Sequence, residues 1–590
     1  MPKKDPKEIK LNGVGASPGI CIGRAYLVDK KGVDVVEKYV IDEDRLQDEI
    51  KRFKAAVKKT RDKLREIIKD TPEKLRQQAY ILETHMLLLK DKMLYGKTIK
   101  TIKKERVNAE WSLRKVVANI KSMFQDMSDP YLRERAADID HVSDRIMRNL
   151  VGAEQVNIGD INQRVILVAH SLSPAETSQI QRERVKGFVT DRGGKASHTG
   201  IIARALEIPA VLGLDNVTGM IQNDDLIIID GTAGIVVINP REKTLAKFEE
   251  RQSRYEEYKA VIIQSSHLPA ETVDGFHMQV MGNIELPEEA VSVHSYGGDG
   301  IGLYRTEFQY LSRTDFPGEH ELFDKYKDVI EVMTPKPVTI RTLDINGDKA
   351  LAQTSDFDEP NPALGLRGIR YCLKKTDVFK TQLKAILRAA VFGNVRIMFP
   401  MITTYEEICE AKRMLDEAAD CLEKEGVIFN RDIKVGILVE VPSAVIMADL
   451  MAKEVDFFSI GTNDLIQYSM AIDRGNRQVA HLFQPLDPAI LRMIKHVADV
   501  AKDKGIKVFI CGEMAGYPIH VPILLGIGID ELSMNPQSIP AVKSVIRSLN
   551  VNDARLFMND IFKQTTATKV FELLRDNYGN ILTDKLYDTK

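Results

Sequence analysis

Residues 193–200 read Gly-Gly-Lys-Ala-Ser-His-Thr-Gly and lie between two apolar segments. The run before them, residues 187–190, predicts a strand, and residues 201–206 predict a helix that begins near His198. Unpaired backbone N–H groups and the positive end of the helix dipole favour an anion at such a helix start. His198 is therefore a candidate to carry a phosphoryl group. The alternative is a polar helix cap with a histidine that lies nearby by chance.

The length and composition describe an ordinary globular protein with several domains. A chain of 590 residues is too long for one core and predicts about three or four domains. The formal net charge of −2 gives no indication of nucleic acid or of an anionic membrane as a partner. No stretch approaches the ~18 apolar residues of a membrane span. The five cysteines form no C-x-x-C pair, which predicts reduced thiols and a cytoplasmic location.

The N-terminal half changes its hydrophobic period twice. Strand-like runs up to residue 30 and after residue 150 predict one α/β domain made of residues 1–30 and 150–237. Between them, apolar residues recur at helical spacing and predict an inserted bundle of four helices over residues 31–149. The helix face with Glu83 and His85 is either a solvated face or a surface for docking a partner. Residues 238–264 are rich in interleaved charges and predict an exposed linker helix.

Residues 265–590 alternate apolar strands with helical segments. Eight strands over about 300 residues, each followed by a helix, predict a (β/α)8 TIM barrel. The predicted strands are Met278–Glu285, Gly300–Thr306, Val338–Asp344, Arg396–Ile402, Lys434–Val441, Phe457–Asp464, Lys507–Glu513 and Glu531–Asn535.

Polar residues gather where these strands end. Such an edge is the active-site face of TIM barrels, and a barrel without catalytic function would not be expected to concentrate charge there. The residues at or near these ends are Arg305, Arg341, Glu440, Asn463, Asp464 and Cys511.

The residue types at this edge indicate the chemistry. Arg305, Arg341 and Arg474 offer fork-shaped donors for a small polyanion. Glu440 and Asp464 are oxygen ligands from consecutive strands, which suffice for Mg²⁺ if a phosphate and waters complete its coordination.

Cys511 has two interpretations. A thiol at this edge can act as a general acid toward an enolate carbon. Alternatively, Cys511 is a small buried residue, which is the commoner role of cysteine.

Six motifs together resemble one known family. They are residues 193–204, 302–307, 341–349, 440–442, 461–465 and 511–516. In this order, and with the inserted helices, the chain resembles Enzyme I of the bacterial phosphotransferase system, the phosphoenolpyruvate–protein phosphotransferases. Single motifs also fit pyruvate phosphate dikinase and phosphoenolpyruvate synthase. Those enzymes carry a large ATP-binding domain ahead of the histidine, where this chain has only a short α/β piece and four helices.

The resemblance implies a role for each candidate residue. His198 would accept the phosphoryl group of phosphoenolpyruvate, and Cys511 would protonate the enolate carbon as pyruvate forms. The substrate would be held by Arg305, Arg341, Asn463, Asp464 and Arg474, and Mg²⁺ by Glu440 and Asp464.

The resemblance also implies partners and a motion. The helical subdomain would dock the histidine phosphocarrier protein (HPr), and the barrel would form a homodimer. One fixed geometry is unsuited to both phosphoenolpyruvate and HPr, so the phosphohistidine domain is expected to swivel between the two. A regulatory phosphoenolpyruvate-sensing paralogue, or a carrier-binding protein without turnover, is the alternative. It predicts loss of His198, of a metal carboxylate or of Cys511, and all of them are present.

Overall fold

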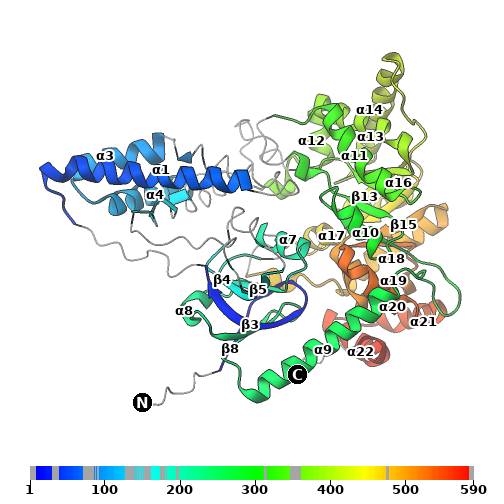
Figure 1. The fold of residues 1–590 in the computed structure, drawn as a ribbon. Helices are drawn as coiled ribbons and strands as arrows, with labels where there is room; N and C mark the ends of the chain where they lie inside the picture. Colours follow the sequence, from blue (N-terminus) through cyan, green and yellow to red (C-terminus); the bar gives the residue numbers. More distant parts are fainter. Residues whose placement is uncertain are drawn as a thin grey trace. The chain divides into compact units, whose positions relative to one another are not determined.

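The computed structural model describes residues 8–28, 39–70, 86, 88–89, 92–125, 139, 142–143, 145–147, 149–150, 161, 163–172, 180, 183–194, 198–310, 315–345, 361–473 and 478–583. The chain forms two compact units, Met1–Glu256 and Glu257–Lys590 (Figure 1). Each unit has hydrophobic clusters of its own.

The first unit contains an eight-stranded mixed sheet. Its order is β1-β8-β7-β3-β4-β5-β6-β2, and β3 to β6 run parallel to one another. Because β3 precedes the helical segment and β4 follows it, that segment is inserted into the α/β fold, as predicted. The strands are β1 (Ile9–Asn12), β2 (Val14–Ser17), β3 (Ile20–Leu27), β4 (Val165–Ala169), β5 (Val185–Thr190), β6 (Ala210–Leu212), β7 (Leu226–Asp230) and β8 (Ile235–Ile238).

The inserted segment has a hydrophobic core of its own. Phe53 and Leu64 of one helix pack with Ile102 and Leu113 of two others, and all four side chains are fully buried. Only part of the segment predicted to form four helices is described. Glu83 and His85 lie outside the described residues. The described helices of the first unit are α1 (Leu46–Asp70), α3 (Lys97–Glu105), α4 (Ala109–Gln125), α7 (His198–Ala205) and α8 (Val217–Met220).

The second unit is a closed barrel of eight parallel strands, which confirms the predicted TIM barrel. Each predicted strand is present. The strands are β9 (Gln279–Ile284), β10 (Ile301–Tyr304), β11 (Val338–Arg341), β12 (Val395–Phe399), β13 (Lys434–Val439), β14 (Phe457–Ile460), β15 (Lys507–Ile510) and β16 (Glu531–Met534).

Four predicted strands run three or four residues past the observed carboxyl ends: those over residues 338–344, 396–402, 457–464 and 507–513. The sequence predicted a single strand over residues 457–464, but β14 ends at Ile460 and helix α17 (Thr462–Ser469) begins two residues later. Thr462, Asn463 and Asp464 are polar residues that suit a first helical turn, where backbone N–H groups lack partners. Asn463 and Asp464 therefore project from a helix start rather than from a strand.

Helices surround the barrel, and their ends follow ordinary capping rules. Helix α14 begins with a capping box between Thr404 and Glu407, and α18 begins with Asp487 followed by proline. The charged linker is helical, as predicted, and forms α9 (Glu242–Gln264). The barrel helices are α10 (Glu289–Ser295), α11 (Glu319–Met333), α12 (Ile369–Lys374), α13 (Thr376–Ala389), α14 (Tyr405–Lys424), α15 (Pro442–Ile446), α16 (Ala448–Met451), α17, α18 (Pro488–Lys504), α19 (Val521–Ile527), α20 (Ile539–Ile546), α21 (Val551–Ile561) and α22 (Ala567–Thr583).

Two observations concern the whole chain as far as it is described. None of the helices in these ranges combines the length and the apolar character that a membrane crossing requires. All five cysteines are free thiols, of which Cys21, Cys372 and Cys511 are buried.

Candidate active site

The carboxyl ends of the barrel strands bring several predicted site residues together. Arg341 is the last residue of β11, whereas Arg305, Glu440 and Cys511 each directly follow a strand. Asp464 lies in the first turn of α17, close enough to Glu440 to raise the pKa of Glu440. Arg474 lies outside the described residues.

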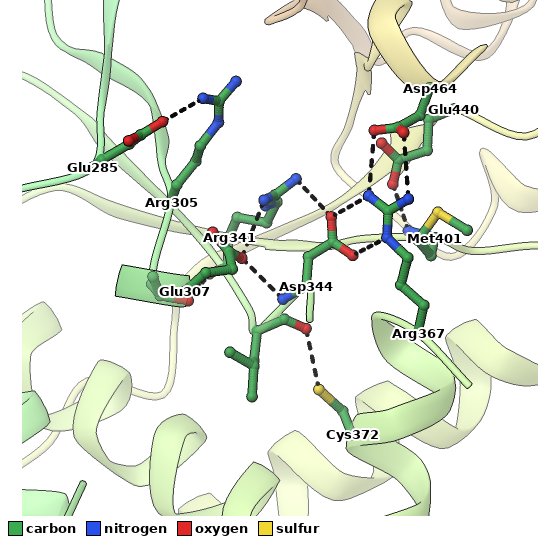
Figure 2. A network of polar contacts seen from close by, with 12 residues as sticks. Glu285, Arg305, Glu307, Arg341, Asp344, Arg367, Cys372, Met401, Glu440 and Asp464 are labelled. Carbon is green, nitrogen blue, oxygen red and sulfur yellow. Dashed lines mark hydrogen bonds and ion pairs between the residues drawn. The ribbon is translucent and has the colours of Figure 1, made fainter. Parts of the chain in front are cut away.

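Arg341 is held between two carboxylates (Figure 2). Its Nη2 lies 3.1 Å from Glu307 Oε1, and its Nη1 lies 3.0 Å from Asp344 Oδ2. Its Nε is buried and has no hydrogen-bond partner in the part of the chain that the structure describes. The guanidinium is thus oriented in advance and retains N–H donors for a ligand.

A second guanidinium, Arg367, joins this network. It binds Asp344 through two hydrogen bonds, Nε to Oδ1 at 2.9 Å and Nη2 to Oδ2 at 3.1 Å. Its Nη1 also lies 3.3 Å from Asp464 Oδ1. Asp344 therefore bridges two arginines, and Arg367 connects that bridge to the predicted metal ligand Asp464 (Figure 2).

Sequence reasoning assigned no role to Glu307, Asp344 or Arg367. Asp344 carried a weak signal, because it follows Arg341 by three residues near a predicted strand end. Arg367 carried none, since it belongs to no strand and precedes the short helix α12.

The charges of the site divide its carboxyl groups into two kinds. Burial, followed by the nearby Asp464 and Asp344, raises the pKa of Glu440 well above its usual range. Burial likewise raises the pKa of Glu307. Burial would also raise the pKa of Asp344, but Arg341 and Arg367 outweigh it and lower this pKa. Asp344 is thus a paired carboxylate, whereas burial together with Asp464 and Asp344 outweighs Arg341 and Arg367 and keeps the pKa of Glu440 raised.

The residues present fit a magnesium ion. Glu440 accepts a hydrogen bond from the Met401 N–H at 2.7 Å through Oε1, while Oε2 has no hydrogen bond to any described residue. A Cβ atom at Gly461 would lie 2.7 Å from this Oε2, so glycine leaves the carboxylate uncovered. Among the described residues no cluster of three His, Cys, Asp or Glu could hold a metal. The chain thus offers two carboxylates, and further oxygens would come from a ligand phosphate and water.

The remaining predicted residues border this network. Arg305 Nη1 lies 2.7 Å from Glu285 Oε1, and both side chains are about one third exposed. Asn463 Oδ1 accepts a hydrogen bond from the Glu513 N–H at 3.1 Å. The Cys511 thiol is buried in the barrel interior, and burial raises its pKa to about 11. It therefore stays protonated near neutral pH, as a proton donor must.

The second predicted station is in the first unit. Strand β5 ends at Thr190, the backbone turns at Gly193 with a φ of +119°, and α7 begins at His198. This positive φ suits glycine. Thr199 is buried, and its Oγ1 donates a hydrogen bond to the Leu172 carbonyl at 3.2 Å. The structure describes the backbone of His198 but not its side chain.

Comparisons with known proteins agree with this arrangement. Three family models match: the N-terminal domain of PEP-utilising enzymes over residues 12–135, their mobile domain over residues 161–234 and their PEP-binding domain over residues 259–551.

Individual relatives extend the similarity to nearly the whole chain. A phosphoenolpyruvate-protein phosphotransferase from Bacillus sp. (strain S) is 44% identical and covers 97% of this chain and 99% of its own length. The Bacillus subtilis protein of the same name is 43% identical over 96% of this chain and 100% of its own. A solved structure of Enzyme I is 40% identical and covers 42% of this chain and 99% of its own, with a TM-score of 0.36. The chain therefore belongs to the PEP-utilising enzymes, in the family of the phosphoenolpyruvate-protein phosphotransferases.

Proposed function

We propose that this protein transfers the phosphoryl group of phosphoenolpyruvate to His198 and then to a histidine phosphocarrier protein (HPr), releasing pyruvate. This is the first step of a sugar phosphotransferase system. The observation that carries the proposal is the barrel edge, where three arginines, the carboxyl groups that pair with them, Glu440 and a protonated thiol come together. Its charge suits a small phosphorylated carboxylic acid, and the 43–44% identical relatives bear the name of this activity.

The barrel residues bind and orient the substrate. Arg341 donates its Nε–H, which has no partner among the described residues, to the phosphoryl group. Arg305 releases Glu285, with which it forms a partly exposed ion pair, and binds a substrate oxygen instead. We add Arg367 to this set, because Asp344 holds it beside Asp464. Asn463, Asp464 and Arg474 complete the predicted binding set. Preoriented cations of this kind stabilise charge on a transferring phosphoryl group without reorganisation during the reaction.

Glu440 and Asp464 would hold Mg²⁺, which supplies further positive charge next to the phosphate. The chain's own contribution is a carboxylate, Glu440, that is buried among negative neighbours and has one oxygen uncovered. A cation bound there would offset the burial and the repulsion from Asp464 and Asp344 that raise the pKa of Glu440.

Proton and phosphoryl transfer complete the reaction. The bond between phosphorus and the enol oxygen breaks, and a bond from phosphorus to a His198 ring nitrogen forms. The electron pair left on the enolate takes a proton from the Cys511 thiol to give pyruvate, and the thiolate regains a proton from water. The pKa of about 11 keeps this thiol protonated at neutral pH.

The proposal includes a division of labour along the chain. Residues 1–30 and 150–237 form the phosphohistidine domain, residues 31–149 dock HPr, and residues 238–264 link them to the barrel of residues 265–590. The phosphohistidine domain swivels between the barrel and the carrier, because in-line transfer needs donor and acceptor within about 3–3.5 Å. We further propose a homodimer through the barrel and a cytoplasmic location, which suits the free thiols.

Radiolabelled phosphoenolpyruvate tests the function. With Mg²⁺ it should give an acid-labile, base-stable label on the purified protein, which HPr then removes. His198→Ala should abolish the label while leaving phosphoenolpyruvate binding intact. Label that persists in this variant would contradict the assignment of His198. Binding without label in the unaltered protein would instead favour a phosphoenolpyruvate-sensing regulator without turnover.

A further inference from the structure

Gln382, on the barrel helix α13, forms hydrogen bonds with the segments that follow two neighbouring strands. Its Oε1 accepts from the Leu343 N–H at 3.0 Å, two residues past β11. Its Nε2 donates to Thr306 Oγ1 at 3.0 Å, two residues past β10, and to the Tyr326 hydroxyl of α11 at 3.1 Å. A backbone N–H can only donate, so the amide atom that faces Leu343 is the oxygen. One acceptor and two donors of this amide are therefore in use.

These hydrogen bonds lie inside the barrel domain, away from solvent. Gln382, Leu343, Thr306 and Tyr326 are each at most 1% exposed. A buried polar group that loses its partner bears the full cost of desolvation, so the amide fixes the groups that it binds. Packing alone does not explain a glutamine here, because the other buried residues of α13 are apolar. They are Val378, Phe379, Leu383, Ala385, Ile386, Leu387 and Ala389.

Thr306 connects the amide to the two arginines of the strand ends. Its Oγ1, which accepts from Gln382, donates to the Arg341 carbonyl at 3.0 Å. This bond continues the contact between β10 and β11 past the last backbone pair of their register. Thr306 also directly follows Arg305 in the chain. One hydroxyl thus joins the backbone next to Arg305 to that of Arg341, and Gln382 holds this hydroxyl in place.

Leu343 provides the second connection. It lies between Arg341 and Asp344, whose side chains pair at 3.0 Å. The Asp344 N–H donates to Glu307 Oε1 at 2.9 Å, and the same carboxylate oxygen lies 3.1 Å from Arg341 Nη2. The oxygen of Gln382 therefore holds the backbone in the middle of the ion-pair network. Gln382 acts on these charges through the backbone that carries them.

We propose that Gln382 is a positioning residue for phosphoenolpyruvate, which ties the ends of β10 and β11 together so that Arg305 and Arg341 bind one substrate in a fixed geometry. The inference rests on the proposed function of the barrel and extends it to a residue behind the site. An amide suits this role, because it joins both segments without changing the charge of the site. Geometry of this kind matters, since a displacement of about 1 Å can cost 10²-fold in rate.

The experiment measures the Kd of phosphoenolpyruvate by calorimetry with Mg²⁺ present, in full-length protein that carries His198→Ala so that no transfer follows. Gln382→Leu removes the amide and should raise the Kd by about 10- to 100-fold. Leu383→Ala is the matched control, because Leu383 is the next residue of α13 and is fully buried in the apolar core. This control should lower the melting temperature and leave the Kd unchanged. An unchanged Kd in Gln382→Leu, or an equal rise in Leu383→Ala, overturns the inference.

A milder pair of variants keeps the test open if Gln382→Leu fails to fold. Thr306→Val removes the hydroxyl between Gln382 and Arg341 and should also raise the Kd, whereas Thr306→Ser keeps a hydroxyl and should restore it. The effects of Gln382→Leu and Thr306→Val should be less than additive in the double variant, because both break one chain of hydrogen bonds. Equal Kd values for Thr306→Val and Thr306→Ser overturn the inference and leave the proposed function standing. If the protein with Gln382 and Thr306 intact binds no phosphoenolpyruvate, the proposed function fails as well.

Discussion

The two proposed reactive sites of this protein are built differently. At the barrel edge, charged side chains neutralise one another before any ligand binds: Asp344 bridges Arg341 and Arg367, and Arg305 pairs with Glu285. At the sheet edge of the first unit, the described polar contacts include threonine hydroxyls, such as that of Thr199, and one His–Asp pair. In the proposed function, the barrel lowers a chemical barrier through preoriented charge, whereas the sheet edge carries the phosphoryl group. Perturbations of the barrel should therefore affect the phosphoenolpyruvate step and spare exchange with the carrier.

Removal of the metal should have the largest effect. With Mg²⁺ chelated by EDTA, or in Glu440→Gln, pyruvate formation should stop almost completely, because the charge of the phosphate then lacks its main counter-ion. Exchange between prephosphorylated protein and HPr, followed with radiolabel, should continue at its normal rate. Unchanged pyruvate formation in EDTA would contradict the metal site. Glu423→Gln, an exposed carboxylate of α14, serves as the control.

Cys511→Ala should slow pyruvate formation by about 10²- to 10⁴-fold, the usual contribution of a general acid, and leave phosphoenolpyruvate binding largely intact. The pyruvate made from labelled substrate should also lose its facial preference. Cys372→Ala removes another buried thiol, which contacts the Leu343 carbonyl at 3.4 Å, and should retain stereospecificity. Retained stereospecificity at normal rate in Cys511→Ala would make Cys511 a simple core residue.

The raised pKa of Cys511 predicts a pH dependence. Burial holds this thiol protonated up to a pKa of about 11, so its ionisation should not reduce activity between pH 7 and 9. Iodoacetamide, which attacks thiolates, should therefore modify the exposed Cys409 well before Cys511. Mass spectrometry of the alkylated peptides measures the order, and early modification of Cys511 would contradict the buried thiol.

Asp344→Asn should act through the position of its arginines. With no carboxylate between them, Arg341 and Arg367 repel each other, and kcat/KM for phosphoenolpyruvate should fall by about 10²-fold. The free energy of unfolding of the barrel should fall by about 3–5 kcal/mol, as expected when one partner of a buried ion pair is lost. Asp420→Asn breaks an exposed pair with Arg431 and should leave the free energy of unfolding nearly unchanged. Urea unfolding and steady-state kinetics measure both effects.

The smallest expected effect concerns stability alone. Burial lowers the pKa of His520 from 6.5 to about 4, despite its hydrogen bond to the Met514 carbonyl. The unfolded chain binds a proton below pH 6.5 and the folded barrel only below about 4. The free energy of unfolding therefore has its full value above pH 6.5. It falls by about 3 kcal/mol in total as the pH drops toward 4. Melting curves at pH 7 and 5 should show this loss, which His520→Gln should reduce and exposed His267→Gln should not.

The sequence determined the architecture of this protein. Apolar runs bounded by turns marked all eight barrel strands, and the helical period marked α1 up to its end at Asp70, because strand and helix patterns are local. The carboxyl ends of several strands could also be read to within about two residues, since a charged residue ends or follows β9, β10, β11 and β13. At Asp464 the prediction carried the strand past Gly461 into Thr462, Asn463 and Asp464, which form the first turn of α17.

Only the tertiary structure decided which charges meet. Arg367 is 23 residues from Asp344 and 97 from Asp464 along the chain, and no spacing rule connects them. His170 is 21 residues from Asp191, and their pairing depends on β4 and β5 lying side by side. The physical reason is the same in both cases. Hydrophobic periodicity is a property of residues that are close together in the sequence. An ion pair of this kind forms between strand ends that approach each other only after the sheet has formed.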